Sequence, residues 1–255
     1  MVNRGKNKDL SVEFYGKMPF NFCDHWCEHC QAADRCQVFQ QSFNLQLTHI
    51  IKGEDANHPD IIIADLKKIF NSLIKNIKKD FKKRGINPKD VRLKIVDLNA
   101  EYKIQKQNLL LWQLGRKFVM ETEKFINDLI FKINQEDIEF TDSLREGIEN
   151  FNWYYGFFGD KIYRAIINWQ ILEKEKKGGL RDLSEKDMNV SAELAFRSLR
   201  VCQKCLEIFS QNLSGYKKWA NDLSILAKSI LEKLETKFTD CHSAQVIFHK
   251  KISID

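Results

Sequence analysis

Apolar side chains recur at intervals of three to four residues through most of the chain after residue 58. This spacing places them on one face of an α-helix. The first such stretch begins at Pro59 and Asp60, which suit a helix N-terminus, and it ends at Gly85 and Pro88. Its apolar positions are Ile62, Leu66, Ile69, Phe70, Leu73, Ile74, Ile77 and Phe81.

The same periodicity predicts four further helices. The second runs over residues 89–133 with a bend expected at Gly115, and the third runs from residue 141 to Gly178. Ser143 and Glu146 are expected to form a capping box at the start of the third helix. The fourth covers residues 185–212, and Gly215 separates it from a fifth that ends near Thr239.

Proline is confined to positions 19, 59 and 88, so residues 89–255 contain none. Since proline disrupts helix interiors, this long tract predicts an all-α fold, a helical bundle of about five long helices. Short connections between such helices favour antiparallel neighbours.

Residues 1–58 show little sustained periodicity and contain four of the seven cysteines. We therefore expect two parts: an irregular cysteine-rich segment at residues 1–58 packed on the bundle, and a helical bundle domain at residues 59–255. A segment that lacks its own apolar core can gain order from metal ligation.

Four cysteines lie close together in the order C-x3-C-x2-C-x5-C, at Cys23, Cys27, Cys30 and Cys36. Four thiolates so close in sequence can converge when the backbone wraps around a metal centre. Both a [4Fe–4S] cluster and a tetrahedral zinc ion accept such a ligand set. In a reducing compartment this pattern favours metal binding over disulfides, so the four residues are the predicted cofactor and metal ligands.

The last three of these cysteines, Cys27, Cys30 and Cys36, form C-x2-C-x5-C. This spacing resembles the final three cluster ligands of the endonuclease III and adenine glycosylase family, and it is similar to the pattern of RecB-type iron–sulfur nucleases. The resemblance is confined to the cysteine segment and implies a [4Fe–4S] cluster. No helix-hairpin-helix loop followed by a catalytic Asp accompanies it, so glycosylase activity is not implied. Zinc is the alternative, although zinc ribbons usually present two separated C-x2-C pairs and this segment has one.

Cys23, Cys27 and Cys30 also give C-x3-C-x2-C, the spacing of radical-SAM enzymes. Those enzymes are built on alternating strands and helices, which this chain does not show. Cys36 would also occupy the iron that such enzymes leave open. We therefore reject this interpretation.

A second C-x2-C pair, Cys202 and Cys205, lies inside a strong helical pattern. These thiols are expected to be small core residues. The alternative is a second zinc site that they would form with Cys241 and His242.

The third helix carries charged residues within a very apolar stretch. Asp160 and Arg164 are four residues apart and could pair on one face. If buried, these charges need partners, for which Glu193 and Arg197 of the fourth helix are candidates. Such a network would fix the register of the helices or line a polar pocket.

Composition sets broad limits on function. Hydrophobic residues make up 43% and charged residues 30%, as in ordinary globular proteins, and the net charge is +6. A basic run at residues 75–84 could contact nucleic acid or an acidic protein, or form a solvated helix face. The N-terminal residues are polar and basic, and no long apolar stretch occurs, so we expect no signal peptide, no membrane contact and a cytoplasmic location.

The sequence shows no recognisable pair of nucleophile and base and no triad of acidic metal ligands. Whether the chain is an enzyme therefore stays open. The sequence predicts a metal-centre protein with an accessory, redox or electron-transfer role. The alternatives are a nucleic-acid-acting protein with a structural iron–sulfur cluster, and a zinc-stapled module for protein interactions.

Overall fold

The computed structural model describes residues 22–30, 33–34, 36–83, 104–135, 141–174 and 179–249. Within these ranges the regular structure is helical, with six α-helices and no strand, which confirms the predicted all-α class. The α-helices are α2 (Gln37–Lys52), α3 (Pro59–Lys83), α4 (Lys106–Asn134), α5 (Asp142–Lys174), α6 (Gly179–Asn212) and α7 (Lys217–Lys237). The short 3-10 helices are η2 (Cys27–His29), η3 (Ser214–Tyr216) and η4 (Cys241–Ser243).

The chain forms two compact units. The larger unit combines Met1–His29 with Ile104–Asp255, and the smaller unit is Cys30–Lys103. The boundary between them falls inside the predicted metal-binding motif.

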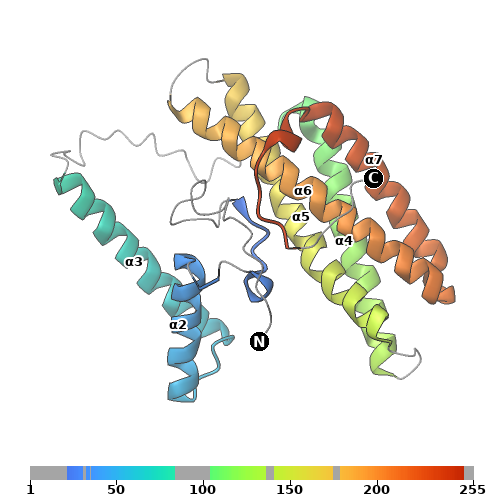
Figure 1. Cartoon of the computed structure of the whole chain (residues 1–255), viewed down its shortest axis with the longest axis horizontal. Helices are drawn as coiled ribbons and strands as arrows, with labels where there is room; N and C mark the ends of the chain where they lie inside the picture. Colours follow the sequence, from blue (N-terminus) through green and yellow to red (C-terminus); the bar gives the residue numbers. More distant parts are fainter. Residues whose placement is uncertain are drawn as a thin grey trace, which may run out of the picture. The chain divides into compact units, whose positions relative to one another are not determined.

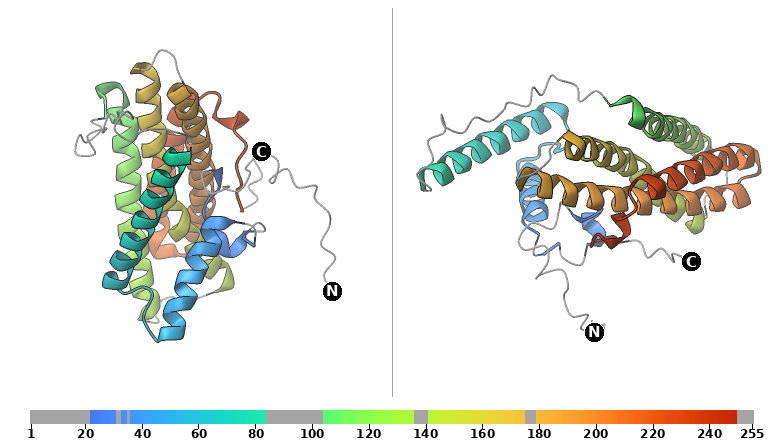
Figure 2. Two further views of the ribbon diagram at one scale, coloured as in Figure 1. Left: turned by 90° about the vertical axis from the view of Figure 1, so that its left-hand side faces the viewer. Right: turned by 90° about the horizontal axis from the view of Figure 1, so that it is seen from above.

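Four helices of the larger unit, α4 to α7, lie side by side as a bundle (Figures 1 and 2). α5 packs against α4 and α6, and α7 packs against α4 and α6, so each helix has two neighbours. Their facing stripes meet in one aromatic core, because apolar side chains three and four residues apart lie on the same side of each helix. Its largest fully buried aromatic members are Phe118, Phe125, Phe151, Tyr154, Phe158, Phe209 and Phe238.

Glycines permit the closest approach between α4 and α5. A Cβ atom at Gly159 would lie 3.0 Å from Val119, and one at Gly115 would lie 3.1 Å from Ile162. α4 is one helix through Gly115. The missing side chain of Gly115 lets Ile162 of α5 pack close to the α4 backbone. The beginning of the second predicted helix, at residues 89–103, lies outside the described residues.

The start of α5 corrects one detail of the sequence analysis. The helix begins at Asp142, and the Thr141 hydroxyl accepts a hydrogen bond from the Leu144 amide at 3.2 Å. Thr141 is therefore the N-cap residue, in place of Ser143, and it satisfies one of the amides that the first helical turn leaves without a partner.

α6 begins earlier than its periodicity predicted, at Gly179 instead of residue 185. Arg181, in its first turn, donates a hydrogen bond to the Leu172 carbonyl near the end of α5 at 3.0 Å. This contact satisfies a terminal carbonyl of α5 and explains why the helical conformation extends back to this point.

In the smaller unit, α2 occupies part of the segment that was expected to be irregular. It ends at Gly53, whose φ of 69° places it in the left-handed region and lets its amide contact the His49 and Ile50 carbonyls. The helix was missed although Phe39, Phe43, Leu47 and Ile50 recur at intervals of three to four residues. Its large apolar side chains Val38, Phe43, Leu47, Ile50 and Ile51 are exposed. How residues 1–58 pack on the bundle stays a prediction.

α2 and α3 are joined by a buried histidine. His49 Nδ1 bonds to Glu54 at 2.7 Å, and its Nε2 bonds to Asp65 of α3 at 2.6 Å. The hydrogen bonds to Glu54 and Asp65 raise the pKa of His49, and the bond to His49 lowers the pKa of each carboxyl. We call this group the His49 clasp.

Candidate metal centres

The structure places the four predicted ligands at different depths. Cys23 and Cys36 are buried, whereas Cys27 and Cys30 are half-buried. Cys23 and Cys27 belong to the larger unit, and Cys30 and Cys36 belong to the smaller one. The convergence of all four on one metal centre therefore stays a prediction.

The first part of the motif is fastened to the bundle by a backbone pairing. Cys23 forms an isolated parallel bridge with Ile247, in which the Ile247 amide donates to Phe22 O at 2.7 Å and the Asp24 amide donates to Ile247 O at 3.1 Å. His25 follows in the left-handed region, with φ of 57°, and turns the chain into η2. These contacts set the position of Cys23 and the direction of the chain after it.

Asp24 is the centre of a buried network that reinforces this pairing. Its side chain is fully buried, and its Oδ2 accepts hydrogen bonds from the Tyr154 hydroxyl at 2.8 Å and the His249 amide at 2.9 Å. Its Oδ1 bonds to Nδ1 of His249 and accepts from the Trp26 amide at 3.3 Å. Burial by itself raises the pKa of Asp24, but the bonds from His249 and Tyr154 outweigh it and hold the pKa below its ordinary value.

Aromatic rings cover this network. Trp26 stacks on Trp153 of α5 with ring centroids 5.6 Å apart, and it meets Tyr154 edge to face at 5.5 Å. The Trp153 indole also donates to the Asp24 carbonyl at 3.1 Å. Trp26 is therefore docked on the bundle.

A buried cation lies within electrostatic range of Cys23. Lys161 of α5 is 2% exposed, its ammonium lies 3.6 Å from Asp160, and it sits over the Phe157 ring at 4.8 Å. Burial lowers the pKa of Lys161, while Asp160 and Cys23 act in the opposite direction.

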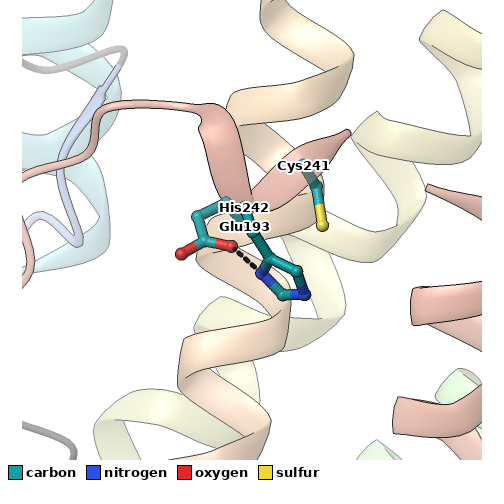
Figure 3. Close-up of side chains that lie close together, drawn as sticks. All are labelled: Glu193, Cys241 and His242. Carbon is teal, nitrogen blue, oxygen red and sulfur yellow. Dashed lines mark hydrogen bonds and ion pairs between the residues drawn. The ribbon is translucent and has the colours of Figure 1, made fainter. Parts of the chain in front are cut away.

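A second group of potential ligands lies on α6 and η4, at Glu193, Cys241 and His242 (Figure 3). Among the described residues, this is the one group of three whose ligand atoms all lie within 4.8 Å of one another. Glu193 and Cys241 are buried, and His242 is about half exposed. Glu193 Oε2 bonds to His242 Nδ1 at 2.8 Å.

Only part of the ligand set of the alternative second zinc site comes together. Cys241 and His242 come together with Glu193, and the group does not include Cys202 or Cys205. Both of those thiols are buried on α6, and burial raises the pKa of Cys202 well above its ordinary value. This is the behaviour of small core residues.

The charged residues of α5 have partners that differ from the expected ones. Arg164 bonds to Asp187 of α6 at 2.7 Å, and Asn168 donates to the same carboxylate oxygen at 2.6 Å. Neither Glu193 nor Arg197 is the partner of Arg164. These two residues bond to each other at 2.6 Å. The network links α5 to α6, as the register interpretation predicted.

The basic run on α3 is exposed at Lys75, Lys78, Lys79, Lys82 and Lys83. This agrees with a solvated helix face, and a contact with nucleic acid stays a prediction. None of the described helices is long and apolar enough to cross a membrane.

The sequence analysis missed Asp24, His49 and His249. Asp24 and His249 are 225 residues apart, and no periodicity connects them. Only the position of Asp24 beside a predicted ligand could have drawn attention to it.

Comparisons with protein-family models, curated proteins and solved structures found no match to the chain.

Proposed function

We propose that this chain binds a thiolate-ligated metal centre, a [4Fe–4S] cluster, through Cys23, Cys27, Cys30 and Cys36, and that it serves an accessory, redox or electron-transfer role. The observation that carries the proposal is the four-cysteine motif, whose first residues are fixed on the bundle by the Asp24 network. Ligands that are already ordered lose less conformational entropy when they bind a metal.

The surroundings of Cys23 support an anionic centre. A cluster held by four thiolates is negatively charged, and the buried ammonium of Lys161 offsets part of that charge. The rings of Trp26 and Trp153 stack beside the first part of the motif, and solvent exposure and nearby charge are two factors that set cluster potentials.

The first experiment is anaerobic purification followed by absorption spectroscopy and by iron, sulfide and zinc analysis. A cluster gives brown protein that contains iron and acid-labile sulfide. Colourless protein whose bound zinc is lost in Cys30→Ser would support the zinc-stapled alternative, and a parent protein with no metal that depends on Cys30 would contradict both.

Cys30→Ser tests the ligand set directly, because Cys30 is half-buried and its replacement leaves the core intact. We expect this variant to lose the metal. Cys205→Ser is the matched control, since Cys205 is a buried thiol outside the motif and its replacement should leave the metal content unchanged. Full metal occupancy in Cys30→Ser would remove that residue from the ligand set.

A nucleic-acid-acting protein with a structural cluster is the second candidate, favoured by the exposed lysines of α3. Electrophoretic binding at several salt concentrations tests it. Each lysine that contacts a phosphate lowers the slope of log affinity against log salt by about 0.9 on duplex DNA. A double variant, Lys78→Gln with Lys82→Gln, should then flatten the slope, and no binding in the parent at low salt would reject this function.

A further inference from the structure

We propose that Glu193, Cys241 and His242 form a second metal site, separate from the cysteine motif, that takes one zinc ion. The three ligand atoms lie within 4.8 Å of one another in the larger unit (Figure 3). This site does not depend on the cluster proposed above, since it shares no ligand with the motif.

The chemistry of the three groups selects the metal. A thiolate sulfur, an imidazole nitrogen and a carboxylate oxygen are the three ligand types that zinc uses in proteins. Calcium and magnesium prefer oxygen ligands alone, so the sulfur and nitrogen argue against them. Three protein ligands leave a fourth position for water, and the half-exposed His242 places one side of the group near solvent.

The charges balance at such a site. Zinc with one thiolate, one carboxylate and one neutral imidazole has no net charge, which suits a location where Glu193 and Cys241 are buried. Binding replaces the proton of the Cys241 thiol by the metal and releases that proton to solvent, with no change of oxidation state.

Neighbouring side chains already orient the ligands. Arg197 donates to Glu193 Oε1 at 2.6 Å, which leaves Oε2 directed toward His242. The Phe196 ring meets the His242 ring edge to face at 4.6 Å. Hydrogen-bonded carboxylates and fixed imidazole rings are the usual outer support of zinc ligands.

The location of the group would let the ion join two segments of the chain. Glu193 lies within α6, and Cys241 and His242 lie in η4, shortly after α7 ends. The chain then continues to Ile247 and His249, which pair with the cysteine segment. Zinc would therefore fasten to α6 the part of the chain on which the motif is docked.

The test measures zinc and cobalt binding to the full chain that carries Cys27→Ser and Cys30→Ser, so that the cysteine motif has lost two of its four thiolates. Cobalt is a spectroscopic substitute for zinc, and a thiolate ligand gives it charge-transfer absorption in the near ultraviolet. We expect one zinc per chain, and cobalt absorption that disappears in Cys241→Ser.

In the same background, His242→Ala should weaken zinc binding by more than about 100-fold, because it removes a direct ligand. Arg197→Gln should weaken it by about 10-fold, as expected for an outer partner. The matched control is His58→Ala, since His58 is also a half-exposed histidine near a carboxylate, with Asp60 at 3.8 Å. His242 is exposed enough for its variant to fold, and thermal unfolding checks this. In the same measurement, added zinc should raise the unfolding midpoint of the background protein and of His58→Ala. It should not raise the unfolding midpoint of His242→Ala.

Equal zinc affinity in the background protein and in His242→Ala would overturn the proposal. So would the absence of zinc binding in a folded background protein. Neither result would bear on the cluster, which is assayed by iron and sulfide in the parent chain.

Discussion

Helices α5 and α3 are both amphipathic, yet they use their apolar residues differently. In α5, Phe151, Tyr154, Phe158 and Ile162 are fully buried between neighbouring helices. In α3, residues with the same spacing, including Phe70, remain exposed. Periodicity therefore identifies a helix and its apolar face, but it does not show whether the chain itself supplies a partner for that face.

The largest expected effect is in the bundle. Phe158→Ala removes a fully buried ring that meets Phe118 edge to face at 5.6 Å, and it should lower the free energy of unfolding by about 4 kcal/mol. Phe70→Ala is the matched variant in α3, where the ring is 60% exposed, and it should change stability by less than about 0.5 kcal/mol.

Urea denaturation followed by circular dichroism measures both variants. A loss in Phe70→Ala comparable with that in Phe158→Ala would mean that the apolar face of α3 is covered in solution. The contrast between the two helices would then disappear.

The next effect concerns the attachment of the motif to the larger unit. Asp24→Asn removes a buried carboxylate that bonds to His249 and Tyr154, and it should cost about 3 kcal/mol. Because the pKa of Asp24 is lowered, its contribution is present above its ordinary value of 3.8 and is lost as the pH falls through the folded value.

Denaturation of parent and variant at several pH values checks this prediction. The difference between them should shrink in acid. Asp60→Asn, at an exposed carboxylate, is the control and should behave like the parent. A difference for Asp24→Asn that stays constant as the pH falls below 3.8 would contradict the proposed role of the charge.

A smaller effect is expected at the start of α5. Thr141→Ala removes the hydroxyl that accepts from Leu144 and should cost about 1 kcal/mol. Ser143→Ala is the control and should change little, because Ser143 lies inside the helix. If thermal unfolding showed a larger loss of stability in Ser143→Ala than in Thr141→Ala, the capping box that the sequence predicted would be supported instead.

The smallest effect is confined to the smaller unit. The raised pKa of His49 means that the clasp is fully stabilising below the ordinary value of 6.5 and weakens as the pH rises through the folded value. The lowered pKa values of Glu54 and Asp65 mean that the carboxylates contribute above their ordinary values of 4.5 and 3.8. The contact between α2 and α3 is therefore strongest between about pH 4.5 and 6.5.

Amide hydrogen exchange of α2 at pH 6 and pH 8.5, corrected for the intrinsic pH dependence, checks the clasp. Protection in α2 should fall at the higher pH, whereas α5 should be unchanged. His49→Gln should remove the pH dependence. Equal protection of α2 at both pH values in the parent would contradict it.

The sequence predicted the features that depend on local pattern. The helical class and the helices at α3, α5, α6 and α7 followed from spacing and from the absence of proline. α2 was missed although Phe39, Phe43, Leu47 and Ile50 follow the same spacing, because the segment was assigned by its cysteines and prolines.

The contacts that position the candidate sites depend on the fold and could not be predicted. Asp24 meets His249, and Glu193 meets His242, only after the helices have packed. Arg164 could be recognised as a charge that needs a partner, but its choice of Asp187 depends on the register of α6 against α5.

The bridge between Cys23 and Ile247 has a consequence for the order of events during synthesis. Ile247 and His249 follow the six described α-helices, so they leave the ribosome after α7. Until then, the carboxylate of Asp24 lacks its histidine and Cys23 lacks its backbone partner. Domains fold as their residues emerge, so the helices can assemble before the cysteine segment docks. The proposed metal centre would then assemble only after the chain has been extended through His249.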